Sequence, residues 1–361
     1  MASDEHRLEI ETPRLSGSTF TVSSSQTATP TNVPPATKTI IPSPIPYPTL
    51  DPEKQIAYAD RTTSDIHVIS GDGNNSHFVT TFTSSHSCTH PNWSPDGSEL
   101  VFSCYVDANS DIYIADAEGT FIRRITYRPE FEYKPIWSPD GQSIAFTTDT
   151  EPDEWALEVL TLDTGRINRV FKGNPRDDGF LETAYSWSDD STQLVFYDIA
   201  IDQLFIVDAS GDNLTQITFD DTSIIAREPA WSPRNHEIVY SGEGGIRLFD
   251  QNTNGDRIII SGYLLYTPYW APNGDIVSAL DNTSNPCIRF VDLQSGEEWR
   301  ILESETILDY TWAPDSTHIA FISDLGHQGQ WSIYTANIYT EEIHELISVD
   351  PELFGTIDWQ P

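Results

Sequence analysis

Five polar side chains at matching repeat positions are the first candidates for binding chemistry. Seven tryptophans recur along the chain, and polar residues of unlike type stand three or four residues before several of them. In a repeat protein, different residue types at equivalent positions indicate that a position has a specific role in one repeat that it lacks in the others. We therefore predict a ligand-contact set that consists of His90, Lys134, Arg227, Glu228 and Asp309. Internal ion pairs, such as Lys134 with Glu132 or Glu182, would explain these residues without a ligand.

Acidic residues recur at the end of a short apolar run in every repeat. They are Asp60, Asp107, Asp149, Asp198, Glu243, Asp281 and Asp324. Clustered carboxylates could bind calcium or a cationic ligand. Aspartate also starts turns well, and this simpler interpretation is the one that we favour.

One segment is similar to the start of a calcium-binding loop. Oxygen ligands stand at its first, third and fifth positions and glycine at its sixth, as Asp250, Asn252, Asn254 and Gly255, with Asp256 next. The twelfth position is Ser261 instead of the usual bidentate glutamate. Calcium at Asp250, Asn252, Asn254 and Asp256 is the one cofactor that the sequence suggests, and a lengthened hairpin turn is the alternative.

The spacing of the tryptophans predicts the strands that position these residues. Trp93, Trp137, Trp187, Trp231, Trp270, Trp312 and Trp359 are separated, by subtraction, by 44, 50, 44, 39, 42 and 47 residues. Most of them open a turn of the type Trp-Ser-Pro-Asp-Gly, which leads into an apolar run such as Leu100-Val101-Phe102. A period of roughly 40–50 residues indicates a repeat architecture.

Each period contains four short predicted strands. After the turn and its apolar strand come a second apolar strand, a glycine-bearing turn and a third strand, and the chain then enters the next tryptophan strand. Four antiparallel strands per period form one blade of a β-propeller. The tryptophan strand should be the innermost of its blade, and its indole should fill the wedge between neighbouring sheets.

The pattern Pro-x-Trp-Ser-Pro-Asp-Gly-x-x-Ile-Ala-Phe, followed by a strand of the Asp-Ile-Tyr type, resembles the TolB-like (PD40, WD40-like) β-propeller repeats. It extends over residues 53 to 361. The resemblance implies an interaction scaffold at the bacterial envelope. The same repeat occurs in prolyl-oligopeptidase-type enzymes, but the chain holds no Gly-x-Ser-x-Gly sequence and no room for a hydrolase domain after Trp359.

The first and last repeats are each incomplete. The first, from Gln55, lacks a tryptophan strand, and the last ends in a spare one, 355–359. We predict that this strand completes the first blade, so that an all-β ring of seven blades is closed by its C-terminal strand. Six blades are the alternative, if a weak repeat is an insertion.

Two of the three cysteines flank the first tryptophan turn. The mean of 88 and 104 is 96, which places Cys88 and Cys104 opposite each other across a hairpin that turns at Asp96. A disulfide between them is expected, and it would favour an oxidising compartment. Two buried free thiols are the alternative, and Cys287 is expected to be a buried apolar residue.

Composition limits the class of partner. The chain carries 19 Lys and Arg residues against 56 Asp and Glu, a formal net charge of −37. This charge argues against nucleic acid, whose affinity depends on cationic side chains, and against anionic membranes. Residues 1–50 are rich in Ser, Thr and Pro and are predicted to be a disordered spacer before a propeller at 51–361.

The sequence favours a monomeric, non-enzymatic propeller that binds a protein, peptide or glycan through its loops and central opening. It is expected outside the cytoplasm, in the periplasm or at the cell surface, although Met1 leads into no apolar leader, and a cytoplasmic location is the alternative. A metal-dependent saccharide lyase or hydrolase remains a second hypothesis, because oligogalacturonate lyases have similar repeats and a histidine-rich metal site. Here His90, His236, His318 and His327 lie in different repeats. A sensor domain of a larger membrane protein is the third.

Overall fold

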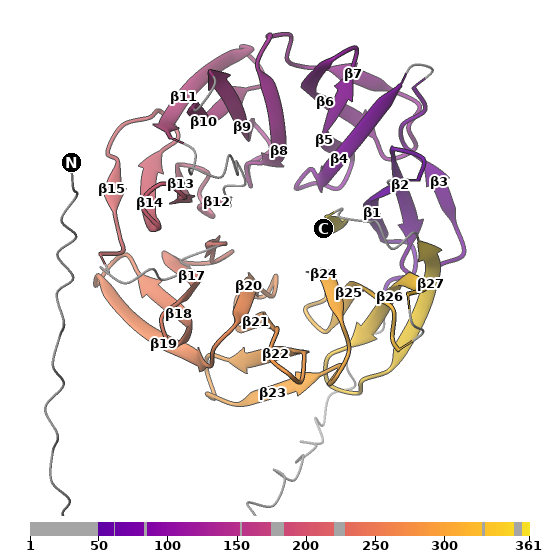
Figure 1. Ribbon diagram of the computed structural model, residues 1–361, viewed down its shortest axis with the longest axis vertical. Coiled ribbons are helices and arrows are strands. Elements are labelled where there is room, and N and C mark those ends of the chain that lie inside the picture. Colours follow the sequence, from indigo (N-terminus) through magenta and orange to yellow (C-terminus); the bar gives the residue numbers. More distant parts are fainter. Residues whose placement is uncertain are drawn as a thin grey trace, which may run out of the picture. The chain divides into compact units, whose positions relative to one another are not determined.

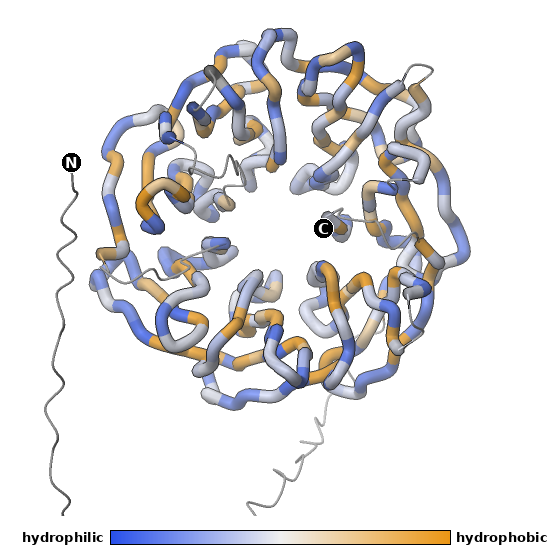
Figure 2. The backbone as a smooth tube through the Cα atoms, viewed as in Figure 1, coloured by the Kyte–Doolittle hydropathy of each residue, from blue (hydrophilic) through white to orange (hydrophobic). Residues whose placement is uncertain are grey.

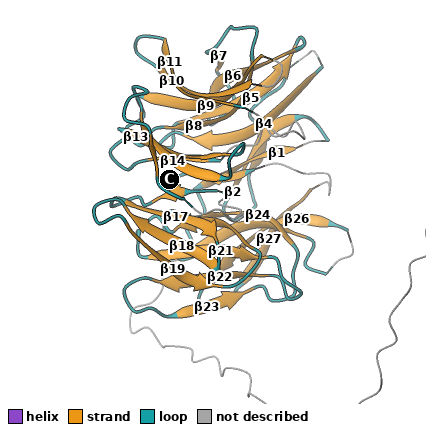
Figure 3. Ribbon diagram, turned by 60° about the vertical axis from the view of Figure 1, so that its left-hand side comes forward, coloured by secondary structure: helices purple, strands orange, loops and turns teal. Residues whose placement is uncertain are grey.

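The computed structural model describes residues 50–60, 62–82, 85–151, 154–174, 184–219, 228–326, 329–349 and 356–361. These residues form seven four-stranded antiparallel sheets arranged in a ring (Figure 1). None of the described residues is helical, so all regular structure in these ranges is strand (Figure 3). The predicted seven-bladed propeller is confirmed, and the six-bladed alternative is wrong.

In each blade the four strands lie side by side, ordered from the ring axis outward. The inner strands are β28 (Ile357–Trp359), β4 (His86–Trp93), β8 (Phe131–Trp137), β12 (Tyr185–Trp187), β16 (Ala230–Trp231), β20 (Leu265–Trp270) and β24 (Ile307–Trp312). The second strands are β1 (Gln55–Asp60), β5 (Glu99–Val106), β9 (Ser143–Glu151), β13 (Gln193–Asp198), β17 (Glu237–Gly242), β21 (Ile276–Asp281) and β25 (His318–Ser323).

Two further strands complete each blade. The third strands are β2 (Asp65–Ser70), β6 (Asn109–Asp116), β10 (Glu154–Thr161), β14 (Gln203–Asp208), β18 (Gly245–Asp250), β22 (Cys287–Asp292) and β26 (Trp331–Asn337). The outer strands are β3 (Ser76–Phe78), β7 (Ile122–Arg124), β11 (Arg166–Gly173), β15 (Thr215–Gln216), β19 (Gly255–Ser261), β23 (Glu298–Ile301) and β27 (Ile343–Val349). We number the blades from the one that contains β1.

The tryptophan turns owe their shape to hydrogen bonds within them. In blade 2 the Ser94 hydroxyl donates to the Asp96 carboxylate at 2.7 Å, and the Ser98 amide donates to the same oxygen at 3.0 Å. These bonds hold the pKa of Asp96 below its usual value. Gly97 has φ +70°, a conformation that glycine adopts without strain. The sequence of the turn therefore specifies its geometry.

The core lies between the sheets. The tryptophan that ends each inner strand is buried in all seven blades. Apolar residues of the second and third strands pack beside it, as Leu100 and Phe102 do with Trp93. The polar residues gather toward the turns and loops (Figure 2). The predicted role of the indoles as wedges between neighbouring sheets agrees with this packing.

The last strand closes the ring. β28 pairs with β1 through Ile56 with Trp359 and Tyr58 with Ile357. The Gln360 amide donates to the carbonyl of Gln55 at 2.8 Å, and the Gln360 side chain donates to the carbonyl of Gly97 in blade 2 at 2.7 Å. The chain's last residues thus join blade 1, as the sequence predicted, and they also contact blade 2.

The antiparallel order gives the ring two faces. We call the side with the tryptophan turns and the third-to-outer turns the turn face. The loop face carries the connections from second to third strands and from each outer strand to the next inner strand. Because β1 is a second strand, the chain enters it from the turn face. Across the described residues, no helix is long and apolar enough to cross a membrane.

Candidate functional site

Four of the five predicted ligand-contact residues lie on or beside the inner strands. His90 belongs to β4, Lys134 to β8 and Asp309 to β24, and Glu228 stands two residues before β16. These strands are the ones nearest the ring axis (Figure 1). Arg227 lies outside the described residues. A ligand role for this set stays a prediction, and its geometry is described below.

A bulge recurs in the inner strands at these positions. In blade 2, Thr89 pairs with Ser103 and Asn92 with Val101, so two residues of β4 oppose one of β5. The first bulged residue has a positive φ in three blades, at His90 (56°), Lys134 (51°) and Thr267 (47°), and Glu228, at the equivalent position before β16, has φ 60°. A left-handed non-glycine residue costs about 1–3 kcal/mol. The four residues are therefore held in place by the surrounding structure.

Proline explains why the bulges recur. Pro91, Pro135, Pro229 and Pro268 directly follow the four residues with positive φ. A proline has no amide hydrogen to donate to a neighbouring strand, and within sheets it is found at edges and bulges. The prolines are visible in the sequence two residues before four of the seven tryptophans. The bulges that accompany them were not predicted.

The cationic part of the inner surface lies in blades 2 and 3. Burial, together with the charge of nearby Lys134, lowers the pKa of His90 to about 3. His90 is therefore neutral at any physiological pH, and its Nδ1 lies 3.0 Å from the Thr89 hydroxyl. The Tyr185 hydroxyl of blade 4 donates to the backbone carbonyl of Lys134. Lys134 is thus the cation that these two inner strands present.

The acidic part comes from blades 5, 7 and 1. Glu228 accepts a hydrogen bond from the Thr267 amide, and Asp309 accepts one from the Ile357 amide at 3.1 Å. Asp358, in the closing strand, accepts one from the Trp93 amide at 2.7 Å. Asp358 was missed by the sequence analysis, although it directly precedes the last tryptophan of the repeat pattern.

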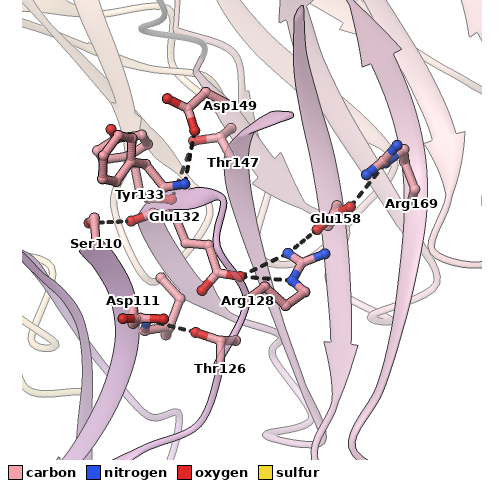
Figure 4. A network of polar contacts seen from close by, with 12 residues as sticks. Ser110, Asp111, Thr126, Arg128, Glu132, Tyr133, Thr147, Asp149, Glu158 and Arg169 are labelled. Atoms are coloured by element: carbon pink, nitrogen blue, oxygen red, sulfur yellow. Dashed lines mark hydrogen bonds and ion pairs between the residues drawn. The ribbon is translucent and has the colours of Figure 1, made fainter. Parts of the chain in front are cut away.

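An ionic cluster lies in blade 3 and includes Arg128 from the loop that leads into that blade (Figure 4). The Arg128 guanidinium donates to Glu132 at 2.8 Å and also to Glu158, while Arg169 donates to Glu158 at 3.0 Å. Burial raises the pKa of Glu132, and Arg128 opposes that change. Glu132, suggested above as a partner of Lys134, thus has Arg128 as its ion-pair partner, while Glu182 lies outside the described residues. Loop residues such as Arg128 carry no repeat signal, so this cluster was not predicted.

The recurring acids at the loop face act within their own loops. The carboxylates of Asp60, Asp198 and Asp281 each accept a hydrogen bond from the backbone amide two residues ahead. Asp149 accepts one from the Phe131 amide at 2.8 Å. The bonds of Asp60, Asp198 and Asp281 have the geometry of aspartate-initiated turns, which was the favoured interpretation, whereas Asp149 bonds across to the neighbouring strand.

The segment 250–256 forms the turn between β18 and β19. The Asn252 amide and the Thr253 hydroxyl donate to Asp250, which closes the turn. Asp256 instead forms an ion pair with Arg247 at 3.0 Å and accepts from the Tyr240 hydroxyl at 2.8 Å. The lengthened hairpin turn is therefore present. Calcium at Asp250, Asn252, Asn254 and Asp256 stays a prediction.

Cys88 and Cys104 are direct cross-strand neighbours in β4 and β5 and are joined as a disulfide, with their Cα atoms 4.1 Å apart. Cys287 is buried as a free thiol, and burial raises the pKa of that thiol to about 11. The disulfide pins the inner strand next to the bulge at His90.

Replacing both Cys88 and Cys104 by serine is expected to lower the free energy of unfolding by about 3 kcal/mol, because a closed loop of about 15 residues then gains freedom in the unfolded chain. Urea denaturation of the variant and of the reduced wild-type protein should give the same loss. Alkylation of both thiols in the non-reduced native protein would contradict this prediction.

Large apolar side chains are exposed mainly around the loop face. Tyr127, Phe219 and Tyr263, in loops that lead to inner strands, are 73%, 75% and 82% exposed. The same face exposes Tyr105, Ile201, Leu264 and Leu308. The third-to-outer turns of the turn face expose Phe121, Leu214 and Ile343. The loop-face residues come from the loops of several blades.

The histidines do not converge. His236 and His318 lie beside tryptophan turns, and His318 is bonded to Asp315 at 2.7 Å, whereas His90 lies in an inner strand. His327 lies outside the described residues. Within the ranges that the structure describes, no three His, Cys, Asp or Glu side chains are placed to hold a metal ion.

Comparison with known proteins agrees with this architecture. The family described as PD40, TolB beta propeller domain, matches residues 36–178. A protein named Protein TolB homolog, from Chlorobium chlorochromatii, is 28% identical over 150 residues, which cover 40% of this chain and 31% of the relative. The Tol-Pal system protein TolB of Francisella tularensis is 30% identical over 100 residues, which cover 27% of this chain and 23% of the relative. The predicted resemblance to TolB-like propellers is confirmed, and the matched stretches span less than a third of either relative.

Solved structures share the fold at low identity. An oligogalacturonate lyase in complex with manganese superposes with a TM-score of 0.59 at 15% identity, covering 83% of this chain and 84% of that one. A puromycin hydrolase variant gives 0.61 at 12% identity, covering 83% of this chain and 53% of that one. Since binding proteins and enzymes both use this fold, the likeness supports the architecture alone.

Proposed function

We propose that this protein is a non-enzymatic binding propeller that takes a protein or peptide partner on its loop face and at the ring axis. The observation that carries the proposal is the set of exposed apolar side chains on the loop face, above all Tyr127, Phe219 and Tyr263. Tyrosine and other aromatic side chains are enriched at protein interfaces, where they bury a large area on contact. Glycans are the other ligand class that such aromatic surfaces suit.

The inner surface adds selectivity to this proposal. It combines the cation Lys134 with the carboxyl groups of Glu228, Asp309 and Asp358, which come from other blades. A partner segment that reaches the axis would meet both signs of charge. Charged groups placed in this way select partners and fix their orientation more than they add affinity.

An extracytoplasmic location fits the same proposal. The disulfide between Cys88 and Cys104 supports this location, because disulfides form and persist mainly in oxidising compartments. The chain enters the first strand of the propeller from the turn face, opposite the proposed interface. A sensor domain within a larger membrane protein would use the same arrangement.

A metal-dependent saccharide lyase or hydrolase is the other hypothesis from the sequence, and no described side chains favour it. Metal analysis of the purified protein and assays on a saccharide panel test it directly. A stoichiometric transition metal together with turnover would replace the binding proposal.

Replacing Tyr127, Phe219 and Tyr263 together by serine is expected to weaken partner binding at least tenfold, because aromatic residues at interface centres often contribute about 2 kcal/mol or more each. Cross-linking and mass spectrometry identify the partner, and calorimetry with that purified partner measures the dissociation constant. The matched control replaces Phe121, Leu214 and Ile343 of the turn face by serine, and it should bind like wild type. Equal loss of binding in both triple variants would contradict a loop-face interface.

A further inference from the structure

Three aromatic side chains form a row on the loop face where blades 2 and 3 meet. They are Tyr105, near the end of β5, and Phe131 and Tyr133, at the start of β8. The ring centres of Tyr105 and Phe131 lie 6.1 Å apart, and those of Phe131 and Tyr133 lie 6.4 Å apart. These distances are typical of interacting aromatic pairs. We call these three side chains the aromatic row.

Strand pairing fixes the position of each ring. Tyr105 directly follows Cys104, whose disulfide joins β5 to β4. Phe131 and Tyr133 are two residues apart in one strand, so their side chains lie on the same face of the sheet. The Phe131 amide also donates to Asp149 at 2.8 Å. A ligand that contacts the aromatic row therefore has little of the protein to order, which favours binding.

The aromatic row keeps surface that a ligand can reach. Tyr105 is 46% exposed, and Phe131 and Tyr133 are each partly exposed. Aromatic rings bury a large area on contact, and their faces carry partial negative charge. The row therefore suits either an apolar group or a cation.

Acidic groups beside the aromatic row favour the cation. Asp149 lies near Tyr133 (Figure 4), and burial, together with the charge of Asp149, raises the pKa of that phenol to about 12. Asp107 is exposed at the tip of the hairpin that carries Tyr105. A cation drawn to the ring faces is attracted further by these carboxylates.

The cations of the neighbouring loops are engaged within the protein. Arg124 and Arg128 form ion pairs with carboxylates of β6, β8 and β10, and Lys172 pairs with Glu154 at 2.5 Å. Lys134 of β8 acts on His90 at the ring axis. The charges that blades 2 and 3 present beside the row are therefore those of Asp107 and Asp149.

We propose that the aromatic row binds an arginine side chain of a basic partner segment, with the guanidinium on the ring faces and its charge balanced by Asp107 and Asp149. This inference rests on the proposed binding function and names the chemistry of the partner. A planar guanidinium stacks on aromatic faces, whereas the ammonium group of lysine is compact and more strongly hydrated. The formal net charge of −37 also favours the approach of a basic segment.

Titration of the full chain with a short capped peptide of alternating glycine and arginine tests the aromatic row. Saturation-transfer NMR measures the dissociation constant at about 0.15 M salt, where distant charges are screened. The same peptide with citrulline, which has the shape of arginine but no charge, should bind about fivefold more weakly. The lysine peptide should have an affinity between the two.

The variant Tyr105→Leu with Phe131→Leu keeps apolar bulk but removes two ring faces. Its affinity for the arginine peptide should fall about fivefold, and its preference for arginine over citrulline should disappear. The matched control Phe121→Leu removes an exposed ring from the turn face and should bind the peptide like wild type. Circular dichroism checks the fold of each variant.

Equal affinity for the arginine and citrulline peptides, or a double variant that binds like wild type, would overturn this proposal. Binding of neutral oligosaccharides at the row, without binding of the arginine peptide, would overturn it as well. If the double variant does not fold, Tyr105→Leu alone should reduce the preference for arginine. An unchanged preference in that single variant would count equally against the row.

The row and the loop-face interface can fail separately. Replacement of Tyr127, Phe219 and Tyr263 by serine tests the interface with the protein partner and leaves the aromatic row intact. If that variant loses the partner while wild type does not bind the arginine peptide, the proposal for the row alone is wrong. If the row binds the peptide as expected but partner binding survives both sets of substitutions, the loop-face interface is wrong.

Discussion

Replacement of Trp359 by alanine is expected to lower the free energy of unfolding by about 3–5 kcal/mol, the usual cost of removing a buried large aromatic side chain. Trp359 is buried and packs with Ile56 and Tyr58 of β1 and with Ala313 and Ala320 of blade 7. Its indole therefore holds the first and last blades together. Urea denaturation followed by fluorescence and circular dichroism measures the change.

Trp231 provides the matched control, because it has the same repeat position and similar burial but lies in an internal blade. Trp231→Ala should cost a similar free energy. Only Trp359→Ala should also increase hydrogen exchange in β1. A loss below about 1 kcal/mol for Trp359→Ala would mean that the closing strand contributes little to stability.

Replacement of Arg128 by alanine is expected to cost about 3–5 kcal/mol, because it leaves two buried carboxylates without their shared cation. The side chains of Glu132 and Glu158 are 0% and 2% exposed, and both bind Arg128. The guanidinium also lies 5.7 Å from the ring centre of Phe146. Thermal and urea unfolding of the variant test this expectation.

The pH dependence of the Arg128 variant gives a further check. Burial already raises the pKa of Glu132, and loss of the arginine would raise it more. Since a raised carboxyl pKa favours the folded state at low pH, Arg128→Ala should be less destabilising at pH 5 than at pH 8. Arg169→Ala is the control: its side chain is 42% exposed, it binds the same Glu158, and its loss should cost less than about 1 kcal/mol. Equal effects of the two substitutions would contradict this account.

The fold was predictable because each blade repeats the same local signals. The tryptophan, the Ser-Pro-Asp-Gly turn and the apolar run after it fix a hairpin in each copy, and the turn bonds of Ser94 and Asp96 show how. Counting the incomplete first and last copies then led to the closure between β1 and β28. The pairing of Cys88 with Cys104 followed from the position of the turn between them.

The candidate site was only partly predictable. His90, Lys134, Glu228 and Asp309 were found because they differ between equivalent positions. The bulges that hold His90 and Lys134 depend on strand pairing, which one sequence does not reveal. The ion pairs of Arg128 depend on a loop that meets its partners only when β8 and β10 come together in the sheet of blade 3. Asp358 was overlooked since its role comes from contacts with the neighbouring blades, which no single repeat contains.

The point where the chain enters the ring has a mechanical consequence. Tension on residues before Leu50 would pass directly into β1, the strand that pairs with β28. A pull along β1 would load its pairs Ile56–Trp359, Ala57–Asp358 and Tyr58–Ile357 together, in shear, instead of breaking them one after another. A propeller that is tethered through this end would therefore resist force where its first strand, β1, pairs with its last strand, β28.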